Sequence, residues 1–198
     1  MKIKKIDFLI QSGNFGASRE FENILDEVKK AIYAVVWPEK NDLFSLYPEK
    51  MANGVVPIKH GFLLLLSEFG WKLEQRMSIV SRLRPGPIDA LKKLSTEKFF
   101  AVEWETGNIS SSHRALNKMA VGLLDGILAG GILILPSRKM YKYLTDRIGN
   151  YAEIEPYFPV WRNLSINEGV LIVIEIEHDE LSFNSPPIKK GTDGRALR

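Results

Sequence analysis

Three carboxylates lie close together in one stretch, GPIDALKKLSTEKFFAVEWETGN, which runs from Gly86 to Asn108. The alternation from Phe99 to Glu105 predicts a half-buried strand. Successive side chains of a strand point to opposite faces, so Glu103 and Glu105 share a face, about 7 Å apart along the strand. Asp89 lies fourteen positions before Glu103. A hairpin of that length can bring Asp89 back beside the strand.

Three carboxylates at one place repel one another unless a cation neutralises them. Mg²⁺ prefers one or two carboxylates together with water and phosphate oxygens. An acidic residue, a variable gap and then Glu-x-Glu on a strand is the arrangement of metal-dependent nucleases, in which the metal activates the attacking water. Two other interpretations stand beside this one: Glu-Trp-Glu is usually the solvated face of a sheet, and Asp89 after Gly-Pro-Ile suits a turn.

The surrounding chain alternates helices and strands, which favours an α/β core with a mixed sheet flanked by helices. Apolar residues at steps of three and four predict amphipathic helices, and short apolar runs predict strands. The predicted elements are a helix from Phe21 to Val35 ended by Pro38, a helix from Pro57 to Gly70, a helix capped within Ser110–Ser112 that carries Leu116, Met119, Leu123 and Ile127, a strand at 131–135, a helix from Ser137 to Gly149 and a strand from Gly169.

Composition narrows the metal, the partner and the compartment. Of 198 residues none is cysteine and three are histidine, which leaves a hard cation held by carboxylate oxygens as the expected metal. The formal charge of +3 permits an anionic partner without requiring one. Apolar runs stay far below the ~18 residues of a membrane span, and we expect a cytoplasmic protein. We expect a single domain over residues 1–187 and a short basic arm over 188–198.

Several uncommon strings carry a resemblance to a known family. They are NGVVPIK at 53–59, GPID at 86–89, EWETGNISSSHRALNKM from Glu103, YLTDRIGNYAEIEPYFP from Tyr143 and KGTDG at 190–194. In this order they resemble the BamHI family of type II restriction endonucleases. The resemblance implies a core of the PD-(D/E)xK type, a homodimer acting on palindromic double-stranded DNA, and a cognate DNA methyltransferase in the host.

The same resemblance implies roles for the acidic residues. Asp89 and Glu103 would hold metal together with the backbone carbonyl of Trp104, and Glu74 matches a further acidic residue at the metal site. Glu105 stands where most related nucleases have lysine, and would orient or deprotonate the attacking water. Two Mg²⁺ ions per site are implied, one at the water and one at the leaving oxygen.

Base recognition is implied as well. The positions matching the family's major-groove contacts are Asn108, Ser110, Arg114, Asp146 and Arg147; Lys59 matches a position near the DNA, and Asp193 and Gly194 match the minor-groove segment. Arginine can bind guanine with two hydrogen bonds and aspartate can accept from cytosine, which suits G·C pairs. The implied target is GGATCC, cut to leave 5′-phosphate ends on a 5′ overhang.

Alternatives remain at each level. Without the resemblance, Asn108 and Ser110 are ordinary turn and cap residues, Arg147 suits a helix C-terminus, and His113 is a surface helical residue. A nuclease of the same core with a different target is one alternative function. A DNA-binding protein that does not cleave and a metal-dependent enzyme acting on small phosphorylated substrates are two others.

Overall fold

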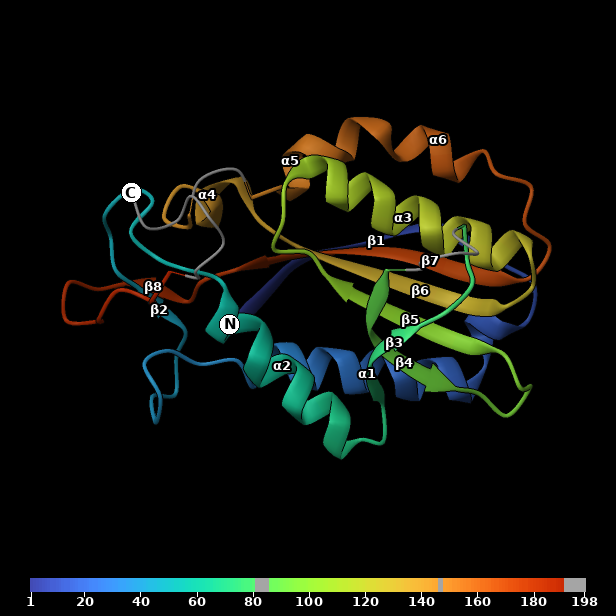
Figure 1. Cartoon of the computed structure of the whole chain (residues 1–198), viewed down its shortest axis with the longest axis horizontal. Coiled ribbons are helices and arrows are strands. Elements are labelled where there is room, and N and C mark those ends of the chain that lie inside the picture. Colours follow the sequence, from blue (N-terminus) through green and yellow to red (C-terminus); the bar gives the residue numbers. More distant parts are fainter. Residues whose placement is uncertain (81–85, 146–147, 191–198) are drawn as a thin grey trace.

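A six-stranded mixed sheet forms the centre of the protein (Figure 1). The computed structural model describes residues 1–80, 86–145 and 148–190. Strands β5, β6 and β7 are parallel, and the outer pairings are antiparallel, so the predicted mixed sheet is confirmed. In spatial order the strands are β1 (Lys2–Ser12), β7 (Gly169–Glu177), β6 (Leu128–Pro136), β5 (Phe99–Trp104), β4 (Pro87–Lys93) and β3 (Lys72–Arg76).

Helices cover both faces of this sheet, as Figure 1 shows. One face packs against α1 (Arg19–Tyr33) and α2 (Val56–Glu68), and the other against α3 (Ile109–Leu124), α5 (Tyr151–Ile154) and α6 (Phe158–Arg162). The remaining elements are η1 (Phe15–Ala17), η2 (Glu155–Tyr157), α4 (Arg138–Tyr141) and a small parallel pair of β2 (Ser45–Leu46) and β8 (Glu180–Leu181). No described helix is both long and apolar enough to cross a membrane.

The first two predicted helices are confirmed, whereas two later ones differ from expectation. Helix α3 begins at Ile109 because Asn108, not a serine at 110–112, is its N-cap and accepts from the backbone N–H of Ser111. The helix predicted from Ser137 to Gly149 has only the four residues of α4. The carbonyls of Lys142 and Tyr143 accept instead from the backbone N–H groups of the segment 51–53. A tertiary pairing thus replaces the helical hydrogen bonds.

The predicted hairpin that returns Asp89 to the strand is also present. Strands β4 and β5 are antiparallel, with Ala90 opposite Val102 and Leu91 opposite Ala101. The same register places Asp89 opposite Glu103. On the other side of β4, the pairs that flank Glu74 place this residue opposite Asp89. Three acidic residues therefore occupy equivalent positions on three adjacent strands.

The predicted C-terminal arm begins against the body of the domain. Ile188 is buried in the core that lies under α1 and α2. Its carbonyl accepts from the backbone N–H of Gly54 at 2.7 Å, and its own N–H donates to Asn53 Oδ1 at 3.3 Å. Residue 188 thus belongs structurally to the domain, because an apolar side chain and two hydrogen bonds hold it there.

Candidate active site

Asp89 and Glu103 form a pair of buried carboxylates at the point where β4 and β5 run together. Their side chains are 9% and 11% exposed. The backbone N–H of Asp89 donates to Glu103 Oε2 at 3.4 Å, and the backbone N–H of Trp104 donates to Asp89 Oδ2 at 2.8 Å. The hairpin thus fixes both carboxylates through backbone groups of the partner strand.

A lysine from each face of the sheet neutralises this pair. Lys59 of α2 lies 2.5 Å from Asp89 Oδ1, and Lys118 of α3 forms an ion pair with Glu103 and donates to the carbonyl of Pro87. Both lysines are largely withdrawn from water. Buried carboxylates are stable only with a cation or a proton. In this structure the two amines supply that charge.

Burial alters the acidity of the carboxylates. Loss of solvent raises the pKa of Glu103 to about 7, with a further contribution from the nearby charge of Asp89, while Lys118 acts in the opposite direction. Burial likewise raises the pKa of Glu105, and a hydrogen bond from Gly107 opposes it. Both shifts bring a carboxyl group closer to the range in which it can exchange protons at neutral pH.

Glu105 follows β5 directly and is half-buried. Its Oε1 accepts from the backbone N–H of Gly107 at 2.7 Å. The charges that act on it are those of Asp89, Lys59 and Arg114, so this side chain shares the electrostatic environment of the buried pair. Glu105 therefore lies within electrostatic reach of Asp89, but among the described residues Asp89, Glu103 and Glu105 do not come close enough together to hold one metal ion as a group.

Glu74 lies on the edge strand β3, opposite Asp89 but with an exposed side chain. Its backbone has φ of 51°, in the left-handed region that side chains rarely adopt. Within residues 1–80, 86–145 and 148–190 no three acidic or histidine side chains meet closely enough to hold a metal ion. The structure therefore brings Glu74 to the same sheet position without bringing its carboxylate into the buried pair.

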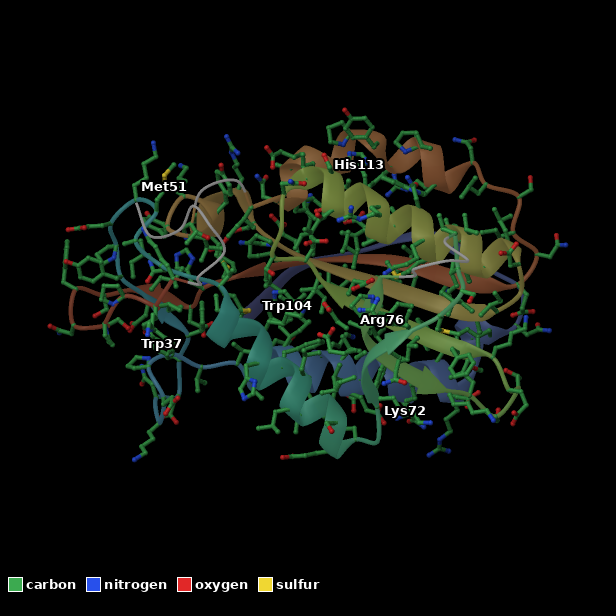
Figure 2. The ribbon with its side chains drawn as sticks, viewed as in Figure 1. Trp37, Met51, Lys72, Arg76, Trp104 and His113 are labelled. Carbon is green, nitrogen blue, oxygen red and sulfur yellow. The ribbon has the colours of Figure 1, made fainter. Side chains whose placement is uncertain are left out.

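The donor set at the pair suits a hard divalent cation. Both carboxylates supply oxygen, and the residues that already lie against them are cations, so the site is built around positive charge. Trp104 has only its backbone carbonyl to offer to such a site, because its indole is buried against Phe62, with the ring centroids 4.7 Å apart. Figure 2 shows Trp104 on the side of the sheet that α2 covers. Asp89 and Glu103 thus offer the oxygen donors that a divalent cation requires.

The predicted base-reading residues lie at the start of α3, next to the carboxylates. Asn108 and Ser110 are exposed, and the exposed Arg114 donates to Ser111 Oγ at 3.0 Å. Gly149 donates to the carbonyl of Gly107 at 2.8 Å, which ties the chain after 147 to this loop. The other predicted contacts, Asp146, Arg147, Asp193 and Gly194, lie outside the described residues.

His113 packs against two aromatic rings of the following helices. Its ring centroid lies 4.6 Å from that of Tyr157 and 5.8 Å from that of Trp161. His113 is therefore a helical residue, as predicted, but it also packs between helices and helps to join α3 to α6.

Lys118 is the residue that sequence reasoning missed. It lies one helical turn after Arg114 on the helix that follows the carboxylate strand. That spacing puts both cations on one helix face. The signal was present, but a lysine on an amphipathic helix is usually a solvated residue. Only the packing of α3 on the sheet, mainly against β6, brings this lysine to Glu103.

Comparison with known proteins agrees with this geometry. The family described as Restriction endonuclease BamHI matches residues 1–195. The chain belongs to the BamHI family of restriction endonucleases. The type II restriction enzyme OkrAI of Oceanobacter kriegii is 50% identical over 198 residues, covering 100% of both chains. The type II restriction enzyme BamHI of Bacillus amyloliquefaciens is 38% identical over 181 residues, covering 87% of this chain and 82% of BamHI.

The fold is shared more widely than the sequence. A crystal structure of the restriction endonuclease BglII complexed with a DNA 16-mer superposes with a TM-score of 0.64 at 11% identity, over 89% of this chain and 79% of BglII. The predicted restriction-endonuclease-like core is therefore confirmed. Membership of the BamHI family makes the chain a type II restriction enzyme, that is, a site-specific deoxyribonuclease.

Proposed function

We propose that this BamHI-family enzyme hydrolyses phosphodiesters of double-stranded DNA with Mg²⁺, at the palindrome GGATCC, leaving 5′-phosphate ends on a 5′ overhang. The observation that carries the chemistry is the buried pair of Asp89 and Glu103, each held against a lysine, with Glu105 beside it. The target sequence rests on the strings shared with the family, including the segment around Asn108.

Each carboxylate has a separate task in this proposal. Asp89 and Glu103, with the Trp104 carbonyl and Glu74, would bind the metal, and the family resemblance implies two ions. Bound Mg²⁺ would polarise the phosphate and lower the pKa of the attacking water. Glu105 orients that water and takes its proton, a role that its raised pKa supports. A lysine at this position would have to lose its charge before it could accept a proton.

Recognition is assigned to the residues at the start of α3 and to the segment before Gly149. Arg114 and Arg147 would donate to guanine, and Asp146 would accept from cytosine. Asn108 and Ser110 are exposed and stand beside Arg114, which supports their access to a major groove. Lys59 would contact the DNA near the carboxylates, and Asp193 and Gly194 would follow the minor groove.

A palindromic target calls for a homodimer, because two-fold symmetry in the DNA is read by two-fold symmetry in the protein. Exposed apolar side chains on η2 and α6 support this, with Tyr157 50% and Val160 62% exposed. Val160→Glu should sediment as a monomer, whereas Leu64→Glu, at a position 55% exposed on α2, should leave the dimer intact. Equal sedimentation of both variants with the wild type would refute an interface at this surface.

The decisive experiment is a digest of plasmid DNA with and without Mg²⁺, followed by sequencing of the ends. We expect discrete cuts at GGATCC only with the metal, and protection of host DNA methylated by a cognate enzyme. Random nicking would refute site-specific cleavage. A discrete pattern at another sequence would refute the target while the chemistry stands.

Matched variants test the roles of the carboxylates. Asp89→Asn and Glu105→Gln should each lower the cleavage rate by at least about 100-fold, the usual size of a lost acid–base or metal-binding group. Glu22→Gln removes an exposed carboxylate of α1 and should cleave as the wild type does. Unchanged cleavage by Asp89→Asn would overturn the mechanism.

A further inference from the structure

A cavity of about 550 Å³ lies between the segment before α2 and the segment around α4. We propose that this basic pocket, formed by Lys50, Arg138, Tyr141 and Lys142, binds backbone phosphates of the duplex outside the recognition sequence. The inference rests on the proposed function, since it concerns how the same duplex is held. Its size lies within the range of ordinary ligand sites.

Backbone hydrogen bonds fix the two walls of the basic pocket. The N–H of Met51 donates to the carbonyl of Lys142 at 3.0 Å, and the N–H of Asn53 donates to the carbonyl of Tyr143 at 2.9 Å. Asn53 is completely buried, and its side-chain amide donates to the carbonyls of Tyr47 and Tyr143. The pocket is therefore preformed, because its walls need no rearrangement to receive a ligand.

Within the part of the chain that the structure describes, no carboxylate compensates the charge of the basic pocket. Lys50, Arg138 and Lys142 are exposed, and none forms an ion pair with any described carboxylate. Neighbouring Lys139 differs, because it pairs with Glu177 at 3.0 Å. Among the described residues that line the cavity there is no acidic side chain. Three cations around one concavity favour a polyanion, and DNA carries about one negative charge per 1.7 Å of its axis.

Arg138 is oriented for such a ligand by an aromatic ring. Its guanidinium lies over Tyr141, 4.9 Å from the ring centroid. Stacking of this kind occupies one flat face of the guanidinium and leaves its N–H edge available for the oxygens of a phosphate.

The position of the basic pocket relates it to the cleavage site. Leu144 lines this cavity and also a smaller one beside Trp104 and Glu105. Figure 2 places Met51 next to α4, at the end of the molecule where Figure 1 shows β2 and β8. On this inference, a duplex seated at Glu105 would extend its flanking backbone over the cations of the pocket.

The test measures DNA binding without divalent metal, so that no cleavage occurs. Two duplexes carry the same recognition sequence, taken from the plasmid digest, with flanks of either two or ten base pairs. The triple variant Lys50→Ala/Arg138→Ala/Lys142→Ala is compared with a control that replaces three exposed lysines elsewhere, Lys30, Lys40 and Lys93. Thermal unfolding verifies that each protein folds, and Arg138→Ala alone provides a milder variant.

The wild type should bind the long duplex more tightly than the short one, and the triple variant should lose this preference. Three lost phosphate contacts lower the salt slope by about 2.7 per protomer, or about 5.4 for the proposed homodimer. The affinity ratio of wild type to variant should therefore shrink about 1,800-fold between 50 and 200 mM salt. The single variant should lower the slope of the homodimer by about 1.8, and the control should retain the preference for long flanks.

Equal salt slopes for the wild type and the triple variant on the long duplex would overturn the inference, as would a wild type indifferent to flank length. Both results are separable from failure of the proposed function, because that failure appears as the absence of discrete cuts by the wild type. The triple variant should still cut at the same sequence, since none of its changes touches the carboxylates.

Discussion

Lys118→Met removes the cation that neutralises Glu103 while keeping most of the apolar stem. Glu103 is then left buried beside Asp89 without its own partner. A carboxyl group in that position responds by holding its proton to higher pH. We therefore expect a loss of stability that depends on pH and becomes smaller when a divalent cation is added.

The wild-type structure sets the scale of this effect. The pKa of Glu103 is about 7 in the folded protein, against 4.5 for an ordinary glutamate. Between these values the folded state keeps a proton that the unfolded state has released, so stability falls as the pH rises. At 1.36 kcal/mol per unit, this change amounts to about 3 kcal/mol from pH 4.5 to above 7. Without Lys118 the pKa rises further, and the decline continues above neutrality.

Urea unfolding in the presence of a chelator measures the prediction. At pH 5, where Glu103 is neutral in both proteins, the free energy of unfolding of Lys118→Met should lie within about 1 kcal/mol of the wild-type value. At pH 9 the variant should be less stable than the wild type by roughly a further 1 to 3 kcal/mol. Millimolar Mg²⁺ at pH 8 should narrow the difference, because a ligand that binds only the folded state stabilises it. Lys93→Met breaks the exposed pair with Glu97 and should show no such pH dependence.

An equal loss for Lys118→Met at pH 5 and pH 9 would refute the reasoning, since it would mean that the lysine contributes packing and not charge. Failure of Mg²⁺ to narrow the difference at pH 8 would refute the idea that a metal takes over the charge of the amine.

Three further predictions concern stability away from the carboxylates. Gly54→Ala should lower the free energy of unfolding by about 1 to 3 kcal/mol, because its methyl group would overlap the backbone of Lys189. Gly61→Ala, on the open side of α2, should be neutral or stabilising. Equal melting temperatures of the two variants would contradict this prediction. Burial lowers the pKa of His178 from 6.5 to about 4, so at intermediate pH the unfolded state binds a proton that the folded state does not, and stability is lost as the pH falls. Relative to His178→Phe, the free energy of unfolding of the wild type should fall by about 3 kcal/mol between pH 6.5 and 4, as measured by urea unfolding. Parallel pH profiles of the two proteins would contradict this prediction. Asn108→Ala should lower the free energy of unfolding by about 1 kcal/mol, because it removes the N-cap of α3. Ser110 is not the cap, so Ser110→Ala should stay within roughly 0.5 kcal/mol of the wild type. The reverse order in thermal unfolding would refute the assignment of the cap.

Local pattern was sufficient for much of the scaffold. The steps of three and four residues from Phe21 to Val35 predicted α1, and the alternation from Phe99 predicted β5, because burial on one face imposes a period that the chain itself displays. Edge strand β1 was not predicted, although Lys2–Ser12 partly alternates. Its charged residues are equally compatible with a strand and with a solvated irregular segment. The antiparallel pairing with β7 makes it a strand.

The helix expected after Ser137 shows the opposite case. Local signals continue through it, yet the chain leaves the helix after Tyr141 because Met51 and Asn53 donate to the carbonyls of Lys142 and Tyr143. Those donors come from about ninety residues earlier. Propensity is a weak preference, and a pairing across the fold outweighs it.

For the site, the sequence alone determined which carboxylates could act together, since the spacing of Asp89, Glu103 and Glu105 on a hairpin is a local property. Tertiary structure decided what surrounds them. Lys59 and Lys118 approach from helices on opposite faces of the sheet, and their direction depends on how α2 and α3 pack. Charge compensation of a buried group acts through space over a few ångströms, and no spacing along the chain specifies which distant side chain will provide it.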